Sequence, residues 1–566
     1  MKSTKVKDNK MKTKVQLEKI LNQINKKGYK AYQQLKNTYQ YPTYLLHLDH
    51  IQKDPYARPT KAHITIKQEI HQIPKEYYNT IPRKIALETI ITQRFHQETL
   101  KHKYNFKSKI TISHNNQEIL LRNNININKE TLTIYFNIGL PANGRRINGI
   151  EAQKLLNNIL PDIIKNTCNY KKYDEKQLQK IITTNEDAEY IRNNLKQKKI
   201  VSFIADNSIL PRKTGNNNKP LKTAKPFKTP ETLKITYNTP NNNKITGMGI
   251  PEGITIIIGG GYHGKTTLLE SIQNGVYNHI YQDGREYTIT DNTATKIKAE
   301  NGRNIEKVNI NSFISNTPNN INTRQFTTNN ASGSTSQATN LIEAIETGSK
   351  LLLIDEDTSA TNFMIQDPLM QEIITTQKEP ITPLTDQIEN LKKQKISLII
   401  VTGGTSQYLQ YADTIIQMDN YEAIDITKKV RKILEDTPQK YSKSEKKLEY
   451  TIRKPRKGCL NSYKGRKKVT KSKELNTILF GTEIVDIRDI EQLVDFDQAL
   501  TISIILDYIT KCIDSKTSIK DIVNKVDQDI QNKGFNILSK TNHNLVYVRP
   551  VDIASVINRI RSLKIV

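Results

Sequence analysis

A glycine-rich stretch containing one lysine is the part of the sequence best suited to hold a phosphate group. It reads GGGYHGKTT over residues 259–267, after the apolar run ITIII and before LLESI. Glycines at the spacing G-x-x-x-x-G-K-[ST] let backbone N–H groups turn towards one phosphate. The residues expected around a bound nucleotide are Gly259, Gly260, Gly261, Tyr262, His263, Gly264, Lys265, Thr266 and Thr267.

The residue types in this loop indicate what each would do. Lys265 would reach the β- and γ-phosphates of ATP, and the Thr266 hydroxyl would be a ligand of Mg²⁺. A helix beginning near Thr266 would direct the positive end of its dipole at the same phosphates. His263 would contact the nucleotide or contribute only its backbone. A glycine-rich turn without a ligand is the alternative, which the flanking strand and helix disfavour.

Two acidic residues, Asp355 and Glu356, end the apolar run LLLIDE. Asp355 is expected to hold Mg²⁺, through water, and Glu356 to polarise the attacking water as the catalytic base, with Lys265 as its catalytic partner. An acidic pair that merely faces solvent is the alternative. Its position 90 residues after Lys265, at the end of a strand expected to be parallel, favours the catalytic interpretation.

A serine- and glycine-containing stretch, ASGSTSQA, ends 17 residues before Asp355 and opens the helical pattern QATNLIEAIE. Serine and glycine are also common at ordinary helix N-termini, so the stretch alone leaves both interpretations open. The tetrapeptide SATN at residues 359–362 follows the acidic pair.

These motifs resemble those of ATP-binding-cassette (ABC) ATPases, and the chain resembles the predicted ATPases of the ABC class found in prokaryotes and some eukaryotes. HIQKDPYARP (50–59), GLPANGRRINGIEA (139–152) and FIADNSILPR (203–212) extend the resemblance to nearly the whole chain. It implies an ABC-type core between family-specific regions and no transmembrane domain. It also implies that Ser332, Gly333 and Ser334 contact ATP held by an opposing copy, that residues 359–362 line the dimer interface, and that nucleic acid, RNA in particular, is a partner.

Three positions depart from the usual ABC pattern. Ser334 stands where the signature has its second glycine, and Gly403 and Gly404 stand where the switch histidine is expected. No glutamine of the Q-loop is identifiable, because none occurs between Gln282 and Gln325. Without the histidine, one contact to the γ-phosphate is lost, so hydrolysis is expected to be slow or differently assisted.

Short apolar runs alternating with helical stretches position these motifs. ITIII, KLLLIDE, ISLIIVTGG and DTIIQMDN are typical of a parallel sheet built from βαβ units. Before them, helical spacing over residues 15–35 and 81–97 and strand-like alternation in YLLHLDHI, AHITIKQEI and ETLTIYFNIGL predict an α+β domain. Residues 210–234 are expected to form an extended loop. EQLVDFDQALTISIILDYI predicts an amphipathic helix near the end of the chain.

The predicted fold is therefore an α/β ABC-type P-loop NTPase core with a parallel sheet, at residues 201–425. An N-terminal α+β domain at residues 1–200 precedes it. A basic segment with a small C-terminal α/β region follows at residues 426–566. The length of 566 residues agrees with several domains, because single cores rarely exceed about 300 residues.

Composition narrows the class of protein. No apolar run approaches the roughly 18 residues of a membrane span, and the basic N-terminus lacks a secretory pattern, so a soluble, non-membrane protein is expected. Three widely spaced cysteines support neither a disulfide framework nor a zinc site, which predicts a reducing, cytoplasmic compartment. The net charge of +29 indicates a polyanionic partner, although some of the lysine excess fits an AT-rich coding sequence.

Lysine and arginine are concentrated in TIRKPRKGCLNSYKGRKKVTKSK (451–473), which contains ten of them and no acid. Such a run tracks a phosphate backbone or is simply a solvated loop. The residues expected to contact nucleic acid, with RNA favoured, are Arg453, Lys454, Arg456, Lys457, Arg466, Lys467 and Lys468. Arg145 and Arg146 would present guanidinium groups to phosphate or lie exposed at a hairpin tip.

The leading hypothesis is an ATPase that closes as a head-to-tail homodimer around two ATP-Mg²⁺ and thereby clamps or remodels nucleic acid. The alternative is an ATP-gated nucleic-acid-binding switch with negligible turnover. A transporter's nucleotide-binding subunit is disfavoured by the long regions on both sides of the core and by the basic excess.

Overall fold

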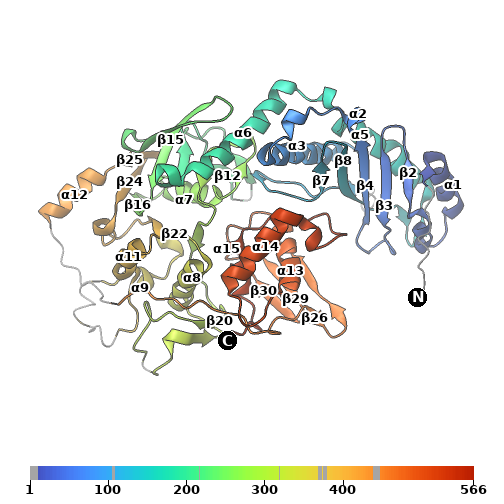
Figure 1. Ribbon diagram of the computed structural model, residues 1–566. Helices are drawn as coiled ribbons and strands as arrows, with labels where there is room; N and C mark the ends of the chain where they lie inside the picture. Colours follow the sequence, from blue (N-terminus) through green and yellow to red (C-terminus); the bar gives the residue numbers. More distant parts are fainter. Residues whose placement is uncertain are drawn as a thin grey trace. The chain divides into compact units, whose positions relative to one another are not determined.

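The computed structural model describes residues 11–104, 109–215, 217–317, 319–367, 373, 379–437 and 446–566. The chain divides into two compact units (Figure 1). Unit 1 comprises Met1–Glu186 and Thr541–Val546, and unit 2 comprises Asp187–Lys540 and Tyr547–Val566. Residues 1–10, which belong to the basic N-terminus, lie outside the described residues. The three-part division predicted from the sequence stays a prediction.

Unit 1 is built on a mostly antiparallel sheet, which alternating apolar residues hold against its helices. Its strand order is β1-β2-β3-β4-β8-β5, and β7 also pairs with β8. Every second residue of β4 and β8 is buried, as expected for a sheet with one face on the core. The strands are β1 (Lys12–Thr13), β2 (Thr38–Gln40), β3 (Leu45–His50), β4 (Thr60–Lys67), β5 (Ile110–Thr111), β7 (Ile125–Ile127) and β8 (Thr131–Ile138).

The helix predicted over residues 81–97 is confirmed as α3 (Ile81–Leu100). The Thr80 hydroxyl caps its N-terminus by accepting a hydrogen bond from the backbone N–H of Arg83. Phe95 of this helix packs on Phe136 of β8, with ring centroids 5.3 Å apart. The other main helices of unit 1 are α1 (Lys14–Ile24), α4 (Gly149–Lys154), α5 (Leu160–Thr167) and most of α6 (Glu175–Asn194).

The helical spacing from Val15 to Leu35 does not form one helix. α1 ends at Ile24, and the chain turns through Lys26, whose φ of 63° is left-handed. A 3-10 helix, Tyr29–Leu35, follows Gly28. The apolar spacing was right for burial, because Leu17, Leu21, Tyr32 and Leu35 all lie in the core. The spacing could not reveal the turn that separates the two helices.

The parallel sheet predicted from the apolar runs is confirmed in unit 2. Its strand order is β19-β22-β23-β16-β24-β25, with β16 parallel to both β23 and β24 and β22 parallel to β23. All five residues of both β22 and β23 are buried, as is typical of a sheet covered on both faces. The strands are β16 (Ile254–Gly259), β19 (Thr295–Ile297), β22 (Leu351–Asp355), β23 (Ser397–Val401), β24 (Thr414–Asp419) and β25 (Glu422–Asp425).

Helices and a second sheet complete the core of unit 2. The second sheet is antiparallel, in the order β14-β15-β11-β18. Its strands are β11 (Ile200–Ala205), β14 (Lys234–Asn238), β15 (Lys244–Pro251) and β18 (Thr288–Thr290), and the helices are α7 (Lys265–Asn274), α8 (Gly333–Thr347), α9 (Thr361–Met364), α11 (Leu384–Lys393) and α12 (Thr427–Asp436). The predicted extended loop at 210–234 contains a hairpin of β12 (Arg212–Thr214) and β13 (Asn217–Pro220).

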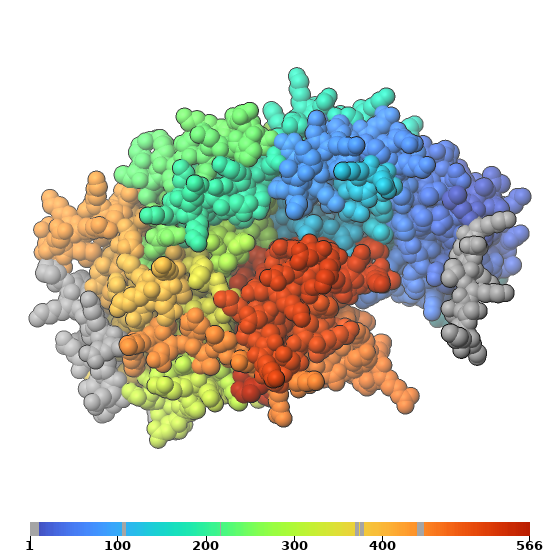
Figure 2. Space-filling model, viewed as in Figure 1, coloured from blue at the N-terminus to red at the C-terminus, as the bar shows by residue number. Residues whose placement is uncertain are grey.

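The C-terminal part of unit 2 is a small α/β region, as expected. Its residues, orange to red, form part of the surface drawn in Figure 2. β26 (Tyr463–Lys464) and β27 (Lys467–Lys468) form a hairpin, followed by an antiparallel sheet of β28 (Thr470–Lys473), β29 (Thr477–Phe480) and β30 (Glu483–Asp486). The helices are α13 (Phe496–Ile509), α14 (Ile519–Lys533) and α15 (Pro550–Ile557). α13 confirms a helix within the predicted span 491–509, but it begins at Phe496, and eight of its 14 residues are buried, so it is not amphipathic as expected.

Candidate nucleotide site

The predicted phosphate loop connects β16 to α7, at the carboxyl end of the parallel sheet. Two of its glycines adopt left-handed backbone angles, with φ of 149° at Gly259 and 97° at Gly264. A Cβ on Gly259 would also lie 2.4 Å from the Met418 carbonyl oxygen. Glycine is therefore required at both places, because other residues would be strained or would clash. Tyr262 also has a positive φ and is 99% exposed, so its side chain points away from the protein.

Lys265 is the first residue of α7, and its ammonium group folds back over the loop. Its Nζ donates to the carbonyl oxygens of Gly259, at 2.8 Å, and Gly260, at 2.9 Å. Thr266 is exposed and Thr267 is half-buried. The dipole of α7 and the free N–H groups of its first turn add positive potential at this end. The loop thus combines a cation, backbone donors and an accessible hydroxyl, which suits a polyphosphate.

The imidazole of His263 is engaged by the protein. Its Nδ1 accepts a hydrogen bond of 3.0 Å from the Asn420 backbone N–H and lies 3.1 Å from an Asp419 carboxylate oxygen. Asp419 ends β24 and Asn420 follows it, with a positive φ. The ring therefore fastens the phosphate loop to the end of a neighbouring strand, a role that the sequence pattern did not suggest.

Asp355 ends β22 and is 3% exposed. One carboxylate oxygen accepts a 3.3 Å hydrogen bond from the Asp357 backbone N–H, and the other lies 3.9 Å from Nζ of Lys296. Burial raises the pKa of Asp355, and the Lys296 cation only partly opposes that shift. A nearby cation stabilises the ionised form of such a buried carboxylate. Asp355 is therefore suited to be a metal ligand.

Glu356 is held by the segment that directly follows β23. Its Oε2 accepts hydrogen bonds from the Thr402 hydroxyl at 2.7 Å, the Gly403 N–H at 2.8 Å and the Gly404 N–H at 3.3 Å. Burial alone would raise the pKa of Glu356, but these donors outweigh it and the net pKa is lowered. The carboxylate is therefore ionised at neutral pH and fixed in position.

The same segment also approaches the phosphate loop. A Cβ on Gly403 would lie 3.7 Å from Nζ of Lys265, and a Cβ on Gly404 would lie 3.4 Å from a carboxylate oxygen of Glu356. The glycines that replace the expected switch histidine thus bring Lys265 and Glu356 to one place. Sequence reasoning missed Thr402, although its position immediately after the apolar strand β23 could have identified it.

The serine- and glycine-rich stretch lies at the N-terminus of α8, as predicted, with Ser332 as the capping residue. Ser332 is exposed, and its hydroxyl lies 3.0 Å from the Thr335 hydroxyl. Ser334 is buried, and its hydroxyl donates to the Asn362 side chain at 2.6 Å. Any contribution of Ser334 to a nucleotide would therefore come from its backbone.

Gln337, one turn further along α8, joins this stretch to residues 359–362. Its amide nitrogen donates to the Ser359 hydroxyl at 2.8 Å, and its carbonyl oxygen accepts from the Ala360 N–H at 2.8 Å. The hydrogen bonds of Ser334 and Gln337 thus connect the two predicted interface stretches to each other rather than to the phosphate loop. Ser332 and Gly333 remain accessible to an external group.

The residues predicted to hold Mg²⁺ have suitable chemistry. Thr266 offers an exposed hydroxyl and Asp355 a carboxylate, and Mg²⁺ in nucleotide sites takes its remaining ligands from phosphates and water. Among the described residues, no group of three or more His, Cys, Asp or Glu side chains could hold a metal ion. Thr266 and Asp355 would supply two oxygen donors to such a cation.

The predicted nucleic-acid contacts require one correction. Arg453 is 2% exposed and forms ion pairs with Glu343 and Glu346, so it cannot contact an external phosphate. The exposed members of the set are Lys454, Arg456, Lys457, Arg466, Lys467 and Lys468. Lys468 also pairs with Asp507 at 2.6 Å. The run is thus partly a hairpin, β26–β27, and not a uniformly solvated loop.

Arg145 and Arg146 lie exposed in a hairpin formed by β9 (Ala142–Asn143) and β10 (Arg146–Ile147). This agrees with the hairpin-tip alternative. Within the described ranges, no helix combines the length and apolar character needed to cross a membrane.

Three family models match the chain. The P-loop domain of ABC ATPases matches residues 174–455, the N-terminal domain of ATPases of the ABC class matches residues 14–171, and the MRB1590 C-terminal domain matches residues 469–566. The fold and the site define a P-loop protein of the ABC type. The chain belongs to the ATPases of the ABC class.

Individual proteins show weaker likeness. Uncharacterized protein MJ1628 of Methanocaldococcus jannaschii is 32% identical over 252 residues, which cover 42% of this chain and 55% of that protein. The ATP-binding cassette MJ1267 in its ADP conformation is 14% identical with a TM-score of 0.23, covering 36% of this chain and 93% of its own. CbiO1 from Clostridium perfringens is 16% identical with a TM-score of 0.22, covering 36% and 95%. The family assignment rests on the family models.

Proposed function

We propose that the protein hydrolyses ATP-Mg²⁺ in a site shared by two head-to-tail copies, and that this cycle drives the binding or remodelling of nucleic acid, with RNA favoured. The main observation behind the proposal is that the segment Thr402–Gly404 lies against both Lys265 and Glu356. A phosphate-binding cation and an ionised carboxylate lie there together, as hydrolysis requires.

Each residue has a distinct part in the proposed reaction. Lys265 and the backbone N–H groups of the loop bind the β- and γ-phosphates, and Glu356 orients the attacking water and accepts its proton. Thr266 and Asp355 hold Mg²⁺, which neutralises charge on the phosphates. Thr402, Gly403 and Gly404 hold the Glu356 carboxylate in position. Ser332 and Gly333 of the second copy complete the site, since both are accessible at the start of α8.

The hydrogen bond from Thr402 predicts a change in pH dependence. Thr402→Val removes a donor that favours the ionised form, so the pKa of Glu356 rises. Because Glu356 must be ionised to act as a base, the acidic limb of the kcat profile moves to higher pH. Thr402→Ser, which keeps the hydroxyl, is the control. Superimposable acidic limbs for the valine variant and the unaltered chain would contradict this assignment.

The basic segment supports the nucleic-acid part of the proposal. Lys464, Arg466, Lys467 and Lys468 are exposed within a six-residue hairpin that also exposes Tyr463. Closely spaced cations bind a phosphate backbone by releasing counterions, and an exposed aromatic ring can stack on a base. The density of charge on a short, fixed hairpin distinguishes it from a generally lysine-rich surface.

Salt dependence tests this part directly. Replacing all four hairpin cations with alanine should reduce the slope of log K against log salt for single-stranded RNA by about 3, at roughly 0.7 per phosphate contact. Filter binding or fluorescence anisotropy with single- and double-stranded RNA and DNA gives the slopes. A control with four exposed lysines of unit 1 replaced, Lys26, Lys27, Lys30 and Lys36, should keep the slope. An unchanged slope in the hairpin variant would exclude this surface.

The proposal places the protein in the cytoplasm as a homodimer. Cys168, Cys459 and Cys512 are all free thiols, which fits a reducing compartment. In this proposal the second copy supplies Ser332, which is exposed and whose hydroxyl contacts only that of Thr335 among the described residues.

A second candidate is an ATP-gated nucleic-acid-binding switch with negligible turnover. The hold of Thr402, Gly403 and Gly404 on Glu356 favours it, because a carboxylate with three donors is a weaker base than a free one. Steady-state phosphate release separates the two candidates. A purified protein that binds ATP and releases phosphate no faster than its Glu356→Gln variant is a switch.

A further inference from the structure

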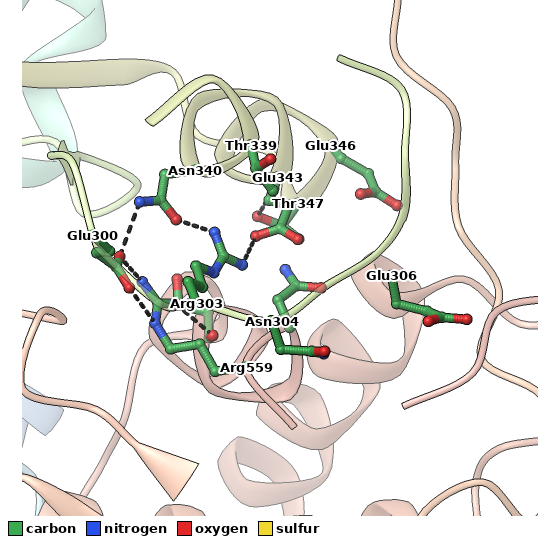
Figure 3. A network of polar contacts seen from close by, with 12 residues as sticks. Glu300, Arg303, Asn304, Glu306, Thr339, Asn340, Glu343, Glu346, Thr347 and Arg559 are labelled. Carbon is green, nitrogen blue, oxygen red and sulfur yellow. Dashed lines mark hydrogen bonds and ion pairs between the residues drawn. The ribbon is translucent and has the colours of Figure 1, made fainter. Parts of the chain in front are cut away.

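The helix that begins at the signature is joined to the C-terminal region by a buried polar network (Figure 3). Asn340, Glu343 and Glu346 lie on α8, two to four turns after Ser332. Arg303 contributes a guanidinium group that bonds Asn340 and Glu343. Buried charges of this kind are stable only when paired and hydrogen-bonded. The network therefore restricts how α8 can move relative to its partners.

Arg453 is the central link on the C-terminal side. Its backbone N–H and Nε donate to the Glu346 carboxylate at 2.6 and 2.8 Å, and Nη1 lies 3.2 Å from Glu343. Nη2 also donates to the Asn558 side chain at 2.9 Å. One buried guanidinium thus connects two carboxylates of α8 to the residue that follows α15. The planar fork of arginine makes these contacts simultaneously, which lysine cannot do.

Arg559 forms a second link beside the first. Its guanidinium pairs with Glu300, and the carboxylate of Glu300 also accepts a 2.9 Å hydrogen bond from Asn340 of α8. The backbone N–H of Glu300 donates to the Ser336 hydroxyl at 2.8 Å, in the first turn of α8. Figure 3 shows Arg559, Glu300, Asn340 and Arg303 in one connected chain of contacts. The link reaches to within four residues of Ser332.

The basic segment, residues 451–473, contains Arg453 and continues directly after it. Lys454, next to Arg453, accepts a backbone hydrogen bond from Val566 at 3.0 Å, and Arg456 donates one to Lys564 at 2.7 Å. Further along, Ser462 and Lys468 on either side of the hairpin bond the carboxylate of Asp507 on α13. The exposed cations therefore belong to the same C-terminal region that is bonded to α8.

We infer that Arg453 and Arg559 are positioning residues that make the signature helix and the basic C-terminal region move together, so that ATP engaged at Ser332 changes the surface that binds nucleic acid. The inference rests on the proposed function, and it adds the route of coupling. It also gives Arg453 a role that differs from phosphate contact.

Hydrogen exchange on the full chain, with and without ATP-Mg²⁺, tests the coupling without any nucleic acid. In the unaltered protein, ATP should slow exchange in α7, in the first turns of α8, and also in α15 and the β26–β27 hairpin. Arg453→Met and Arg559→Gln should keep the response in α7 and α8 and reduce the response of α15 and the hairpin at least about threefold. Arg453→Lys should restore part of it.

Controls separate this role from a purely structural one. Arg488 is an exposed arginine of the same region whose partner, Asp486, is also exposed, so Arg488→Met should leave every response unchanged. Arg559 is less buried than Arg453, with side-chain exposures of 10% and 1%, and its variant carries the test if Arg453→Met does not fold.

The outcomes distinguish the inference from the proposed function. No ATP response in α7 would mean that the nucleotide site itself is wrong. A response in α7 and α8 with none in the C-terminal region of the unaltered chain would overturn the coupling alone. An equal C-terminal response in the unaltered chain and in both arginine variants would also overturn it.

Discussion

Replacing Glu356 with glutamine is expected to lower multiple-turnover phosphate release roughly 10²- to 10⁴-fold, the range that a general base contributes. The amide has nearly the same shape and still accepts hydrogen bonds from Thr402, Gly403 and Gly404. It cannot, however, accept a proton from the attacking water. ATP affinity should stay within a few-fold of the unaltered chain, because the phosphate loop is unchanged.

Asp357→Asn provides the matched control, since Asp357 is the exposed neighbour of Glu356 on the same turn. Its rate should remain close to that of the unaltered chain. If both variants released phosphate at the rate of the unaltered chain while binding ATP, Glu356 would not be the base.

Replacing Lys265 with alanine is expected to weaken ATP binding by about ten- to a hundredfold, the value of one or two hydrogen bonds to a charged group. The lysine ammonium already lies among the loop carbonyls of Gly259 and Gly260, so it needs little rearrangement to meet a phosphate. Isothermal titration calorimetry with ATP-Mg²⁺ measures the change. Lys350→Ala, at an exposed position before β22, should leave the affinity unchanged.

Lys265→Ala, mixed with a second variant, Ser332→Arg, tests whether two copies share the site. Ser332→Arg places a bulky cation at the exposed start of α8, where the serine side chain makes no capping hydrogen bond. Each variant alone should be nearly inactive at an ATP concentration that saturates only the unaltered chain. An equal mixture should recover about a quarter of the activity, because half of the dimers are mixed and each of these has one intact site. A mixture as inactive as its components would contradict a shared site.

Much of the nucleotide site could be predicted from the sequence because its geometry is set by local rules. A phosphate loop must follow a strand and precede a helix, and an acidic pair that ends a buried parallel strand must lie at the same edge of the sheet. GGGYHGKTT and LLLIDE satisfy both rules, and β16, α7 and β22 have the expected positions. The parallel direction of these strands likewise follows from the alternation of apolar runs and helices.

Features that depend on contacts between distant segments could not be predicted in the same way. From its charge, Arg453 was predicted to be an exposed cation. It is instead buried in ion pairs with Glu343 and Glu346 of α8, and nothing near residue 453 in the sequence indicates these partners. Thr541–Val546 pack with the N-terminal unit although residues 187–540 separate them from the rest of it. The hold of Thr402 on Glu356 requires β22 and β23 to be neighbours, which the sequence order alone does not state.

The central claim is that one chain turns over ATP and links that turnover to nucleic acid. Steady-state phosphate release by the purified protein, measured while single-stranded RNA is titrated in at low salt, tests it most directly. The account predicts a basal rate that depends on Glu356 and changes at least about threefold as RNA saturates, by the linkage between two coupled sites. A rate that stays constant while anisotropy shows the RNA to be bound, or that equals the rate of Glu356→Gln throughout, would contradict it.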